Sequence, residues 1–186
     1  MKGFPRIQTT RLLLRPFSLH DLEPLHQLWA DPDVRRYLWD DDTIAREQVV
    51  SEIRKSIIDF RKHRFGQWAV LPLGQETLIG FCGLGLRHFG DPPEVELLCA
   101  IAVAYWGQGL ATEATQAVLR YGFEEIHLSR ILAGADEPNT ASLRLMKRIG
   151  MSFDRCVQLH GREAVYYGLT REVFNPPDSS YIVQRT

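Results

Sequence analysis

A glycine-containing turn, from Trp106 to Ala111, separates a strand-like run from a helical run of the sequence. Gly107 and Gly109 allow a tight backbone path and remove side chains that would keep a ligand at a distance. The N-terminus of the following helix directs free N–H groups and partial positive charge toward the turn, which favours an anion such as a phosphate. On spacing alone, a tight turn without a ligand explains the same glycines equally well.

Two common nucleotide-binding motifs do not fit this turn. A dinucleotide fingerprint, GxGxxG, requires its third glycine where Thr112 stands, and a fingerprint that began at Gly83 would require one at His88. No GxxxxGK[ST] run of a P-loop occurs in the chain. These departures exclude a Rossmann dinucleotide site and a P-loop.

Two carboxylates lie on the strand that we expect from Glu94 to Val103. Side chains alternate between the two faces of a strand, so Glu94 and Glu96 share one face while the other face, from Val95 to Val103, is wholly apolar. The carboxylate face is expected to look toward a cleft or solvent.

The surrounding elements follow from hydrophobic periodicity and turn residues. We expect strands over residues 11–17, 67–71, 77–84, 94–103, 130–135, 153–159 and 164–169, and helices over residues 22–30, 46–64, 110–125 and 139–149. This order predicts an α/β (α+β) fold, a mixed sheet flanked by helices. Residues 1–174 are interpreted as a single domain, and residues 175–186 as a loose C-terminal tail.

Composition narrows the classes of partner. The 22 basic and 23 acidic residues give a formal net charge of -1, which favours neither nucleic acid nor an anionic membrane surface. No apolar run is long enough to span a membrane, and the N-terminus lacks the apolar region of a signal peptide, so we expect a cytoplasmic protein. Without CxxC or HExxH spacing, no metal site is predicted.

Three ordered segments resemble the GNAT superfamily of N-acetyltransferases, and in particular the branch of ribosomal-protein N-terminal acetyltransferases. They are Thr10 to Arg15, Tyr105 to Ala114, and Asn139 to Ser142 with Ile149 to Met151, and the resemblance extends from Thr9 to about Leu169. Trp106 stands where Gln or Arg is usual in the family's phosphate turn. The resemblance implies a mostly antiparallel sheet of about seven strands and acetyl-CoA as co-substrate.

The resemblance also implies which residues hold acetyl-CoA. The backbone of the strand end would pair with the pantetheine arm, the turn would present N–H groups to the pyrophosphate, and two residues of a later helix would contact the arm and the sulfur. In this order the residues are Ile101, Ala102 and Val103; Gly107, Gln108, Gly109, Leu110, Ala111 and Thr112; and Asn139 and Ser142. Arg144, Lys147 and Arg148 could meet the phosphates of the coenzyme or form a solvated helix face.

The resemblance implies catalytic roles as well. Glu96 aligns with an acidic position of the branch and is our candidate base, with Glu94 next; an exposed carboxylate paired with an arginine is the alternative. His88 and His160 are further base candidates. Many family members use a tyrosine as acid where this chain has Met146, and Ser142 fits a variant in which a serine bonds the departing sulfur.

The acyl acceptor is expected to bind over the early helices. Tyr37 and Trp39, beside three aspartates, could hold a cationic amine, although ordinary packing also explains these rings. The predicted function is transfer of acetyl from acetyl-CoA to a primary amine, a protein N-terminus or a small molecule, by direct attack in a ternary complex. A non-catalytic acyl-CoA sensor or scaffold is the alternative. Apolar strand edges near the C-terminus make a homodimer a further expectation.

Overall fold

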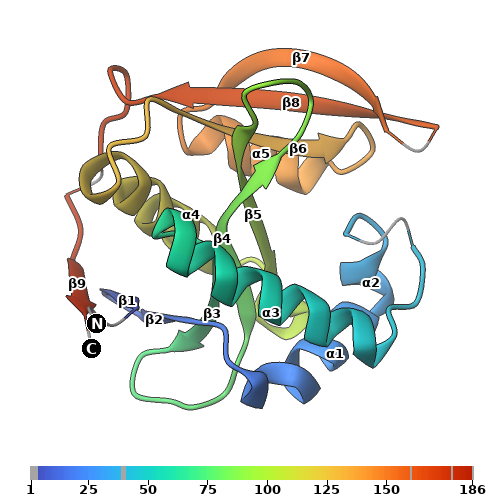
Figure 1. Ribbon diagram of the computed structural model, residues 1–186, viewed down its shortest axis with the longest axis vertical. Helices are drawn as coiled ribbons and strands as arrows, with labels where there is room; N and C mark the ends of the chain where they lie inside the picture. Colours follow the sequence, from blue (N-terminus) through green and yellow to red (C-terminus); the bar gives the residue numbers. More distant parts are fainter. Residues whose placement is uncertain (1–3, 39–40, 160, 177, 186) are drawn as a thin grey trace.

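One nine-stranded sheet organises the computed structural model, which describes residues 4–38, 41–159, 161–176 and 178–185 (Figure 1). The strand order is β7-β8-β6-β5-β4-β3-β2-β1-β9. The strands are β1 (Pro5–Thr9), β2 (Leu12–Pro16), β3 (Gln67–Pro72), β4 (Gly80–Arg87), β5 (Glu94–Ile101), β6 (Arg130–Asp136), β7 (Ser152–Leu159), β8 (Arg162–Thr170) and β9 (Tyr181–Arg185). The predicted mostly antiparallel sheet is confirmed, because among the described residues β5 and β6 are the only strands that pair in parallel.

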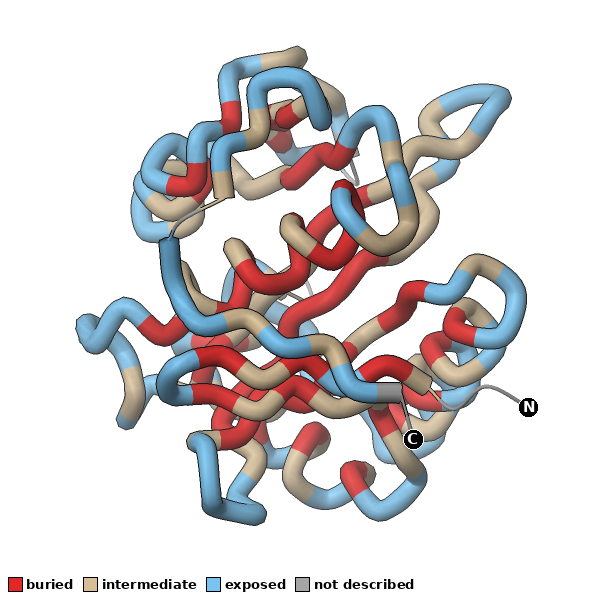
Figure 2. Tube along the Cα trace, turned by 90° about the vertical axis from the view of Figure 1, so that its left-hand side faces the viewer, coloured by how far each residue is buried: buried red, intermediate tan, exposed pale blue. Residues whose placement is uncertain are grey.

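The sheet has nine strands rather than about seven, because β1 and β9 were not predicted. The two strands pair antiparallel over five residues each, from Pro5 opposite Arg185 to Thr9 opposite Tyr181. The expectation of a loose tail is therefore wrong for residues 181–185. In Figure 2 the exposed C-terminal segment crosses the surface of the molecule before it reaches this edge of the sheet.

The helices form a layer on each face of the sheet. They are α1 (Leu22–Ala30), α2 (Pro32–Arg35), α3 (Arg46–His63), α4 (Leu110–Arg120), which continues as a π-helical turn over Tyr121–Glu125, and α5 (Thr140–Arg148). The first three bury Trp29, Val34 and Ile53 against Phe81 on one face. On the opposite face α4 and α5 contribute to the larger core around Trp68. Buried residues accordingly concentrate in the central strands and on the inner sides of the helices (Figure 2).

The two halves of the sheet part between β5 and β6. Glu96 pairs with Leu132, and this is the one register position that joins these strands in the described residues. Figure 1 shows β5 and β6 diverging from each other. The N–H and C=O groups of β5 beyond Glu96 that face β6 therefore have no ladder partner on that side, which leaves backbone hydrogen-bonding capacity for a ligand.

Candidate active site

The glycine turn lies where its sequence predicted, directly before α4. Gly107 and Gly109 both adopt left-handed backbone conformations, with φ of 75° and 76°, and Gly109 is the residue before the first helical residue. A Cβ built on Gly107 meets nothing within 4 Å. The N–H groups of the first helical turn have no intrahelical acceptor. The turn is thus an open cradle of backbone donors.

Trp106, which stands where Gln or Arg is usual in the family's phosphate turn, links the turn to β5. Its Nε1 donates a hydrogen bond of 2.6 Å to the carbonyl oxygen of Ile101, while the side chain stays 52% exposed. The ring therefore connects the end of β5 to the turn. It fixes the turn relative to the strand whose backbone was predicted to bind the pantetheine arm.

Hydrogen bonds among Thr9, Arg11 and Glu113 also stabilise the turn, and the sequence analysis did not predict this role. Glu113, in the first turn of α4, accepts hydrogen bonds from Thr9 Oγ1 at 2.6 Å and from the backbone N–H and Nε of Arg11 at 2.9 and 2.6 Å. Arg11 also donates to the carbonyl of Gln108 at 2.9 Å. Burial alone would raise the pKa of Glu113, but these hydrogen bonds lower it. The family-like segment at Thr10 to Arg15 thus includes a support for the turn.

An open pocket of about 450 Å³ adjoins the turn. Its lining includes Gly109 and Thr112 at the start of α4, together with Arg11 of the β1–β2 turn, Arg120 at the end of α4 and Arg148 at the end of α5. Of the three basic residues that the sequence placed on α5, Arg148 is the one that lines this pocket. The backbone and hydroxyl donors of Gly109 and Thr112 at the start of α4, with the guanidinium group of Arg11 beside them, suit an anionic ligand.

Several backbone groups from Ile101 to Val103, the stretch predicted to bind the pantetheine arm, form hydrogen bonds within the protein. The N–H of Ala102 donates to Ile79 at 2.8 Å, and the carbonyl of Ile101 accepts from Trp106. The carbonyls of Ala102 and Val103 accept from the N–H groups of Tyr105 and Trp106. Pairing with a ligand in this stretch is consequently restricted to the groups and lone pairs that these contacts leave.

Asn139 caps the N-terminus of α5, a structural role that was not predicted in addition to contact with the pantetheine arm. Its Oδ1 accepts the N–H of Ser142 at 3.1 Å, so Asn139 is the N-cap of the helix. The side-chain amide of Asn139 keeps its two N–H donors for other partners. Asn139 and Ser142 therefore lie together in one capped helix start.

The carboxylate of Glu96 is buried, at 6% exposure, rather than open to solvent. Tyr166, on β8, donates its hydroxyl to Glu96 Oε1 at 3.0 Å, and Nε of Arg87, on β4, lies 3.1 Å from Oε2. Burial raises the pKa of Glu96, while the charge of Arg87 and the bond from Tyr166 lower it; Lys55, on α3, adds a further favourable charge. A carboxylate whose pKa lies above its usual value is better suited to accept a proton near neutral pH. Neither Arg87 nor Tyr166 was a predicted site residue.

Glu94, the second base candidate, is engaged in an ion cluster. It forms a close ion pair with Arg155 of β7, and Arg130 of β6 lies 3.8 Å away. Glu94 therefore serves as an ion-pair partner that ties β5 to β6 and β7. Of the histidine candidates, His88 is exposed in the β4–β5 connection, and His160 lies outside the described residues.

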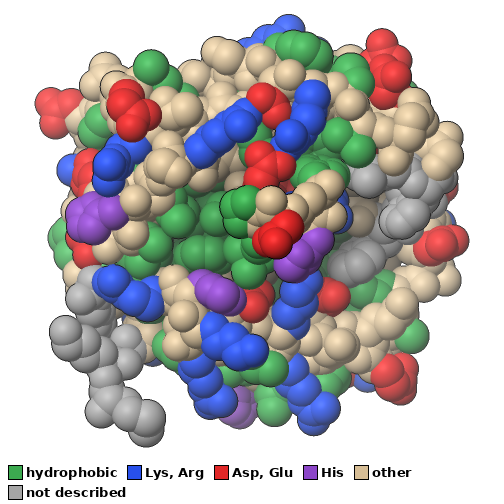
Figure 3. All heavy atoms as spheres, turned by 45° about the horizontal axis from the view of Figure 1, so that its top comes forward, with side chains coloured by type: hydrophobic (Ala, Val, Ile, Leu, Met, Phe, Trp, Pro, Cys, Tyr) green, Lys and Arg blue, Asp and Glu red, His purple; other side chains and the backbone are tan. Residues whose placement is uncertain are grey.

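Glu96 and Ser142 approach the parted strands from opposite faces of the sheet. Leu97, the neighbour of Glu96, belongs to the core beneath α4 and α5, so Glu96 projects to the face covered by α1 and α3. Ser142 stands on α5, on the other face. The gap between β5 and β6 lies between them. The space-filling view shows a hollow with a hydrophobic floor and Lys and Arg side chains on its rim (Figure 3).

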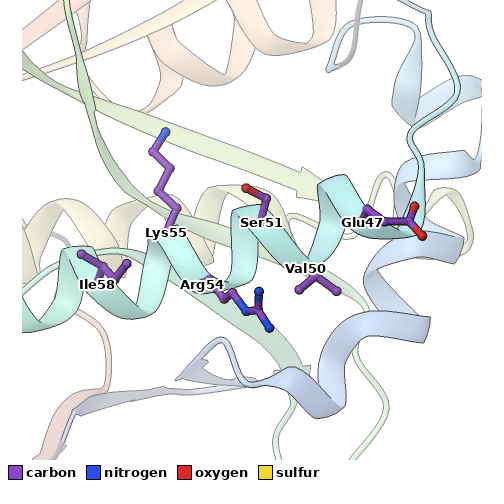
Figure 4. A pocket seen from close by; sticks show the side chains of 6 residues that line it. All are labelled: Glu47, Val50, Ser51, Arg54, Lys55 and Ile58. Carbon is purple, nitrogen blue, oxygen red and sulfur yellow. The ribbon is translucent and has the colours of Figure 1, made fainter.

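The predicted acceptor residues are only partly placed. Tyr37 is 39% exposed after α2, and Trp39 lies outside the described residues. A second hollow, of about 320 Å³, runs along α3 and was not predicted. It is lined by Glu47, Val50, Ser51, Arg54, Lys55 and Ile58. Ser51 and Lys55 point to one side of the helix, and Val50 and Arg54 to the other (Figure 4).

Within the described ranges, no group of three or more His, Cys, Asp or Glu side chains is arranged to hold a metal ion. The same ranges contain no helix with the length and apolar character required to cross a membrane.

Comparison with known proteins identifies the class that this architecture defines. A solved GNAT-family acetyltransferase from Bacillus anthracis superposes with a TM-score of 0.75 at 28% identity, covering 90% of this chain and 99% of that one. The uncharacterized N-acetyltransferase YnaD of Bacillus subtilis is 29% identical over 91% of this chain and 99% of its own length. The spermidine N(1)-acetyltransferase of Escherichia coli K12 is 26% identical over 76% of this chain and 73% of its own.

The sequence-family model of the acetyltransferase (GNAT) domain matches residues 11–152, which is most of the chain. The chain therefore belongs to the GNAT acetyltransferase family. It is an N-acetyltransferase that uses acetyl-CoA.

Proposed function

We propose that the protein transfers the acetyl group of acetyl-CoA to a primary amine by direct attack in a ternary complex. The observation that carries the proposal is the gap between β5 and β6, which opens beside the glycine turn and lies between Glu96 on one face and Ser142 on the other. The acetyl donor enters from the side of α4 and α5. The acceptor reaches the gap from the side of α3.

The turn and the adjoining pocket suit the charged end of the coenzyme. The N–H groups from Gly107 to Thr112 bind the pyrophosphate, and the guanidinium groups of Arg11 and Arg148 supply positive charge beside it. Asn139 directs its amide N–H groups at the pantetheine arm while its oxygen caps α5. The free backbone edge of β5 completes this binding surface.

Glu96 accepts a proton from the amine, directly or through one water, so that a neutral nitrogen attacks the thioester carbon. The new C–N bond forms and the C–S bond breaks. The proton that the attacking nitrogen loses as it becomes an amide passes to the departing thiolate, to which the hydroxyl of Ser142 donates a hydrogen bond, so coenzyme A leaves as the free thiol. The acceptor is a protein N-terminus, as the resemblance to the ribosomal-protein branch suggests, or a small amine, as in the spermidine-acetylating relative.

The test is release of free coenzyme A thiol from acetyl-CoA in the presence of a panel of amines. The panel contains spermidine, amino acids, and peptides with free N-termini, and acetyl-CoA binding is measured in parallel by calorimetry. Thiol release that depends on one of these amines supports the proposal. Binding without release under every condition supports the non-catalytic sensor, and an absence of binding refutes both.

A further inference from the structure

The two polar partners of Glu96, a hydrogen-bond donor and an ion-pair partner, are divided between its two oxygens. Oε1 accepts from Tyr166, which is 1% exposed, and Oε2 faces Arg87, whose side chain is 42% exposed. Arg87 Nη2 also donates to the hydroxyl of Tyr166 at 3.2 Å, so the three side chains form a closed set of contacts. A buried carboxylate without such partners would become protonated.

The ring of Tyr166 reaches Glu96 because the residue opposite it has no side chain. Tyr166 pairs with Gly134 of β6, and a Cβ on Gly134 would lie 2.4 Å from Cζ of the ring. The ring can therefore lie across β6 and present its hydroxyl to β5. Phe89, from the β4–β5 connection, packs edge-on against the ring at a centroid distance of 4.9 Å. The orientation of the hydroxyl is thus fixed by packing on the ring.

The hydroxyl of Tyr166 acts as a donor throughout the working pH range. Burial and the charge of Glu96 raise the pKa of Tyr166 to about 12. The titratable and charged groups that face Glu96 are Arg87 from β4, Tyr166 from β8 and Lys55 from α3. Among them Tyr166 is the fully buried one, so its contact is the least weakened by solvent.

We propose that Tyr166 is a positioning residue: its hydroxyl, held in place by Gly134 and Phe89, keeps Glu96 ionised and aimed at the gap between β5 and β6. The inference rests on the proposed function, in which Glu96 is the base. Tyr166 does not exchange a proton with the substrate. It determines the orientation of the base and the pH at which the base becomes charged.

The first test is Tyr166→Phe, which keeps the ring against Gly134 and Phe89 and removes only the hydroxyl. The acid limb of the kcat/KM profile for the amine is expected to move up by about one pH unit, a loss of about tenfold on that limb, since one pKa unit is a factor of ten. KM for acetyl-CoA is expected to stay at the wild-type value. At high pH, where Glu96 is ionised in both proteins, the plateau of Tyr166→Phe is expected to stay below that of the wild type, because the orientation of the base is lost.

Two further variants separate positioning from general damage. Tyr167→Phe removes the neighbouring hydroxyl on the opposite face of β8 and is expected to leave the profile in place. Gly134→Ala displaces the ring while the hydroxyl remains, and is expected to shift the profile in the same direction as Tyr166→Phe.

A readout independent of turnover is the ¹³C NMR titration of the Glu96 carboxyl, which should move to higher pH in Tyr166→Phe. An active wild type whose pH profile and Glu96 titration both coincide with those of Tyr166→Phe would overturn the inference. Failure of the wild type to acetylate any amine would instead overturn the proposed function. The NMR titration would then still decide whether Tyr166 controls the charge of Glu96.

Discussion

Replacing Gly109 by alanine distinguishes a phosphate-binding turn from a turn that is merely tight. The chain offers a matched control in Gly74, which lies in the connection between β3 and β4, far along the sequence from the turn. Both glycines have left-handed backbones, with φ of 76° and 78°. Neither has a neighbour that a new methyl group would overlap: Arg11 Nη2 lies 3.7 Å from a Cβ on Gly109, and nothing lies within 4 Å of one on Gly74.

The conformational cost of the two substitutions is therefore similar. An L-residue in the left-handed region loses about 1–2 kcal/mol relative to glycine, so both variants should lower the free energy of unfolding by about this amount. Only the methyl group on Gly109 stands where the pyrophosphate is proposed to approach the backbone. Losing one hydrogen bond to a charged oxygen costs about 1.5–3 kcal/mol, which corresponds to a Kd for acetyl-CoA weakened at least about tenfold.

Urea unfolding gives the stability change of each variant, and isothermal calorimetry gives its Kd for acetyl-CoA. We expect equal destabilisation and unequal binding, with Gly109→Asp weaker still because it adds negative charge beside the phosphates. If Gly109→Ala and Gly109→Asp both bound acetyl-CoA with the wild-type Kd, the turn would not be the pyrophosphate site. An equal loss of affinity in Gly74→Ala would show that strain alone is responsible.

Three other expectations follow from the structure. Glu113→Gln should lower the free energy of unfolding by about 1–2 kcal/mol at pH 7, because it weakens hydrogen bonds to a charged group. Because the folded state lowers the pKa of Glu113, this difference should shrink as pH falls below the usual glutamate pKa of 4.5; a constant difference in urea titrations would contradict the assignment. Ser142→Ala should reduce kcat by about 10- to 150-fold, because a hydrogen bond to a charged group contributes about 1.5–3 kcal/mol, and leave the Kd for acetyl-CoA unchanged; equal turnover would remove Ser142 from the mechanism. Deleting residues 178–186 removes β9 and should abolish hydrogen-exchange protection along the outer edge of β1, which retained protection would refute.

The spacing of hydrophobic residues along the sequence was sufficient to predict most of the helices and strands. The spacing of Val49, Ile53 and Phe60 predicts α3, and all three side chains are buried in the structure. The strand β9 escaped prediction because its partner, β1, is more than 170 residues away, and prolines precede it. A strand at a sheet edge is defined by its partner as much as by its own residues.

The candidate site was predictable where it depends on backbone and on short motifs. The glycine turn and the capped start of α5 lie where their sequences indicated. The environment of Glu96 was not predictable, because Tyr166 is 70 residues distant and its contact depends on the strand order of the folded sheet. One signal was available in retrospect: a glycine at position 134, within an otherwise apolar strand, marks a place where another group passes close by.

The gap between β5 and β6 has one side formed mainly by backbone and one formed mainly by side chains, and the two sides respond differently to substitution. On the side where we propose that acetyl-CoA binds, the walls of the gap consist largely of peptide groups, which every amino-acid sequence supplies, so substitutions in the strands leave that surface intact. The side proposed for the acceptor consists of side chains on α3 and the adjacent loops, which can be exchanged one at a time. A protein built on this plan can therefore retain one acyl donor while its amine substrates change.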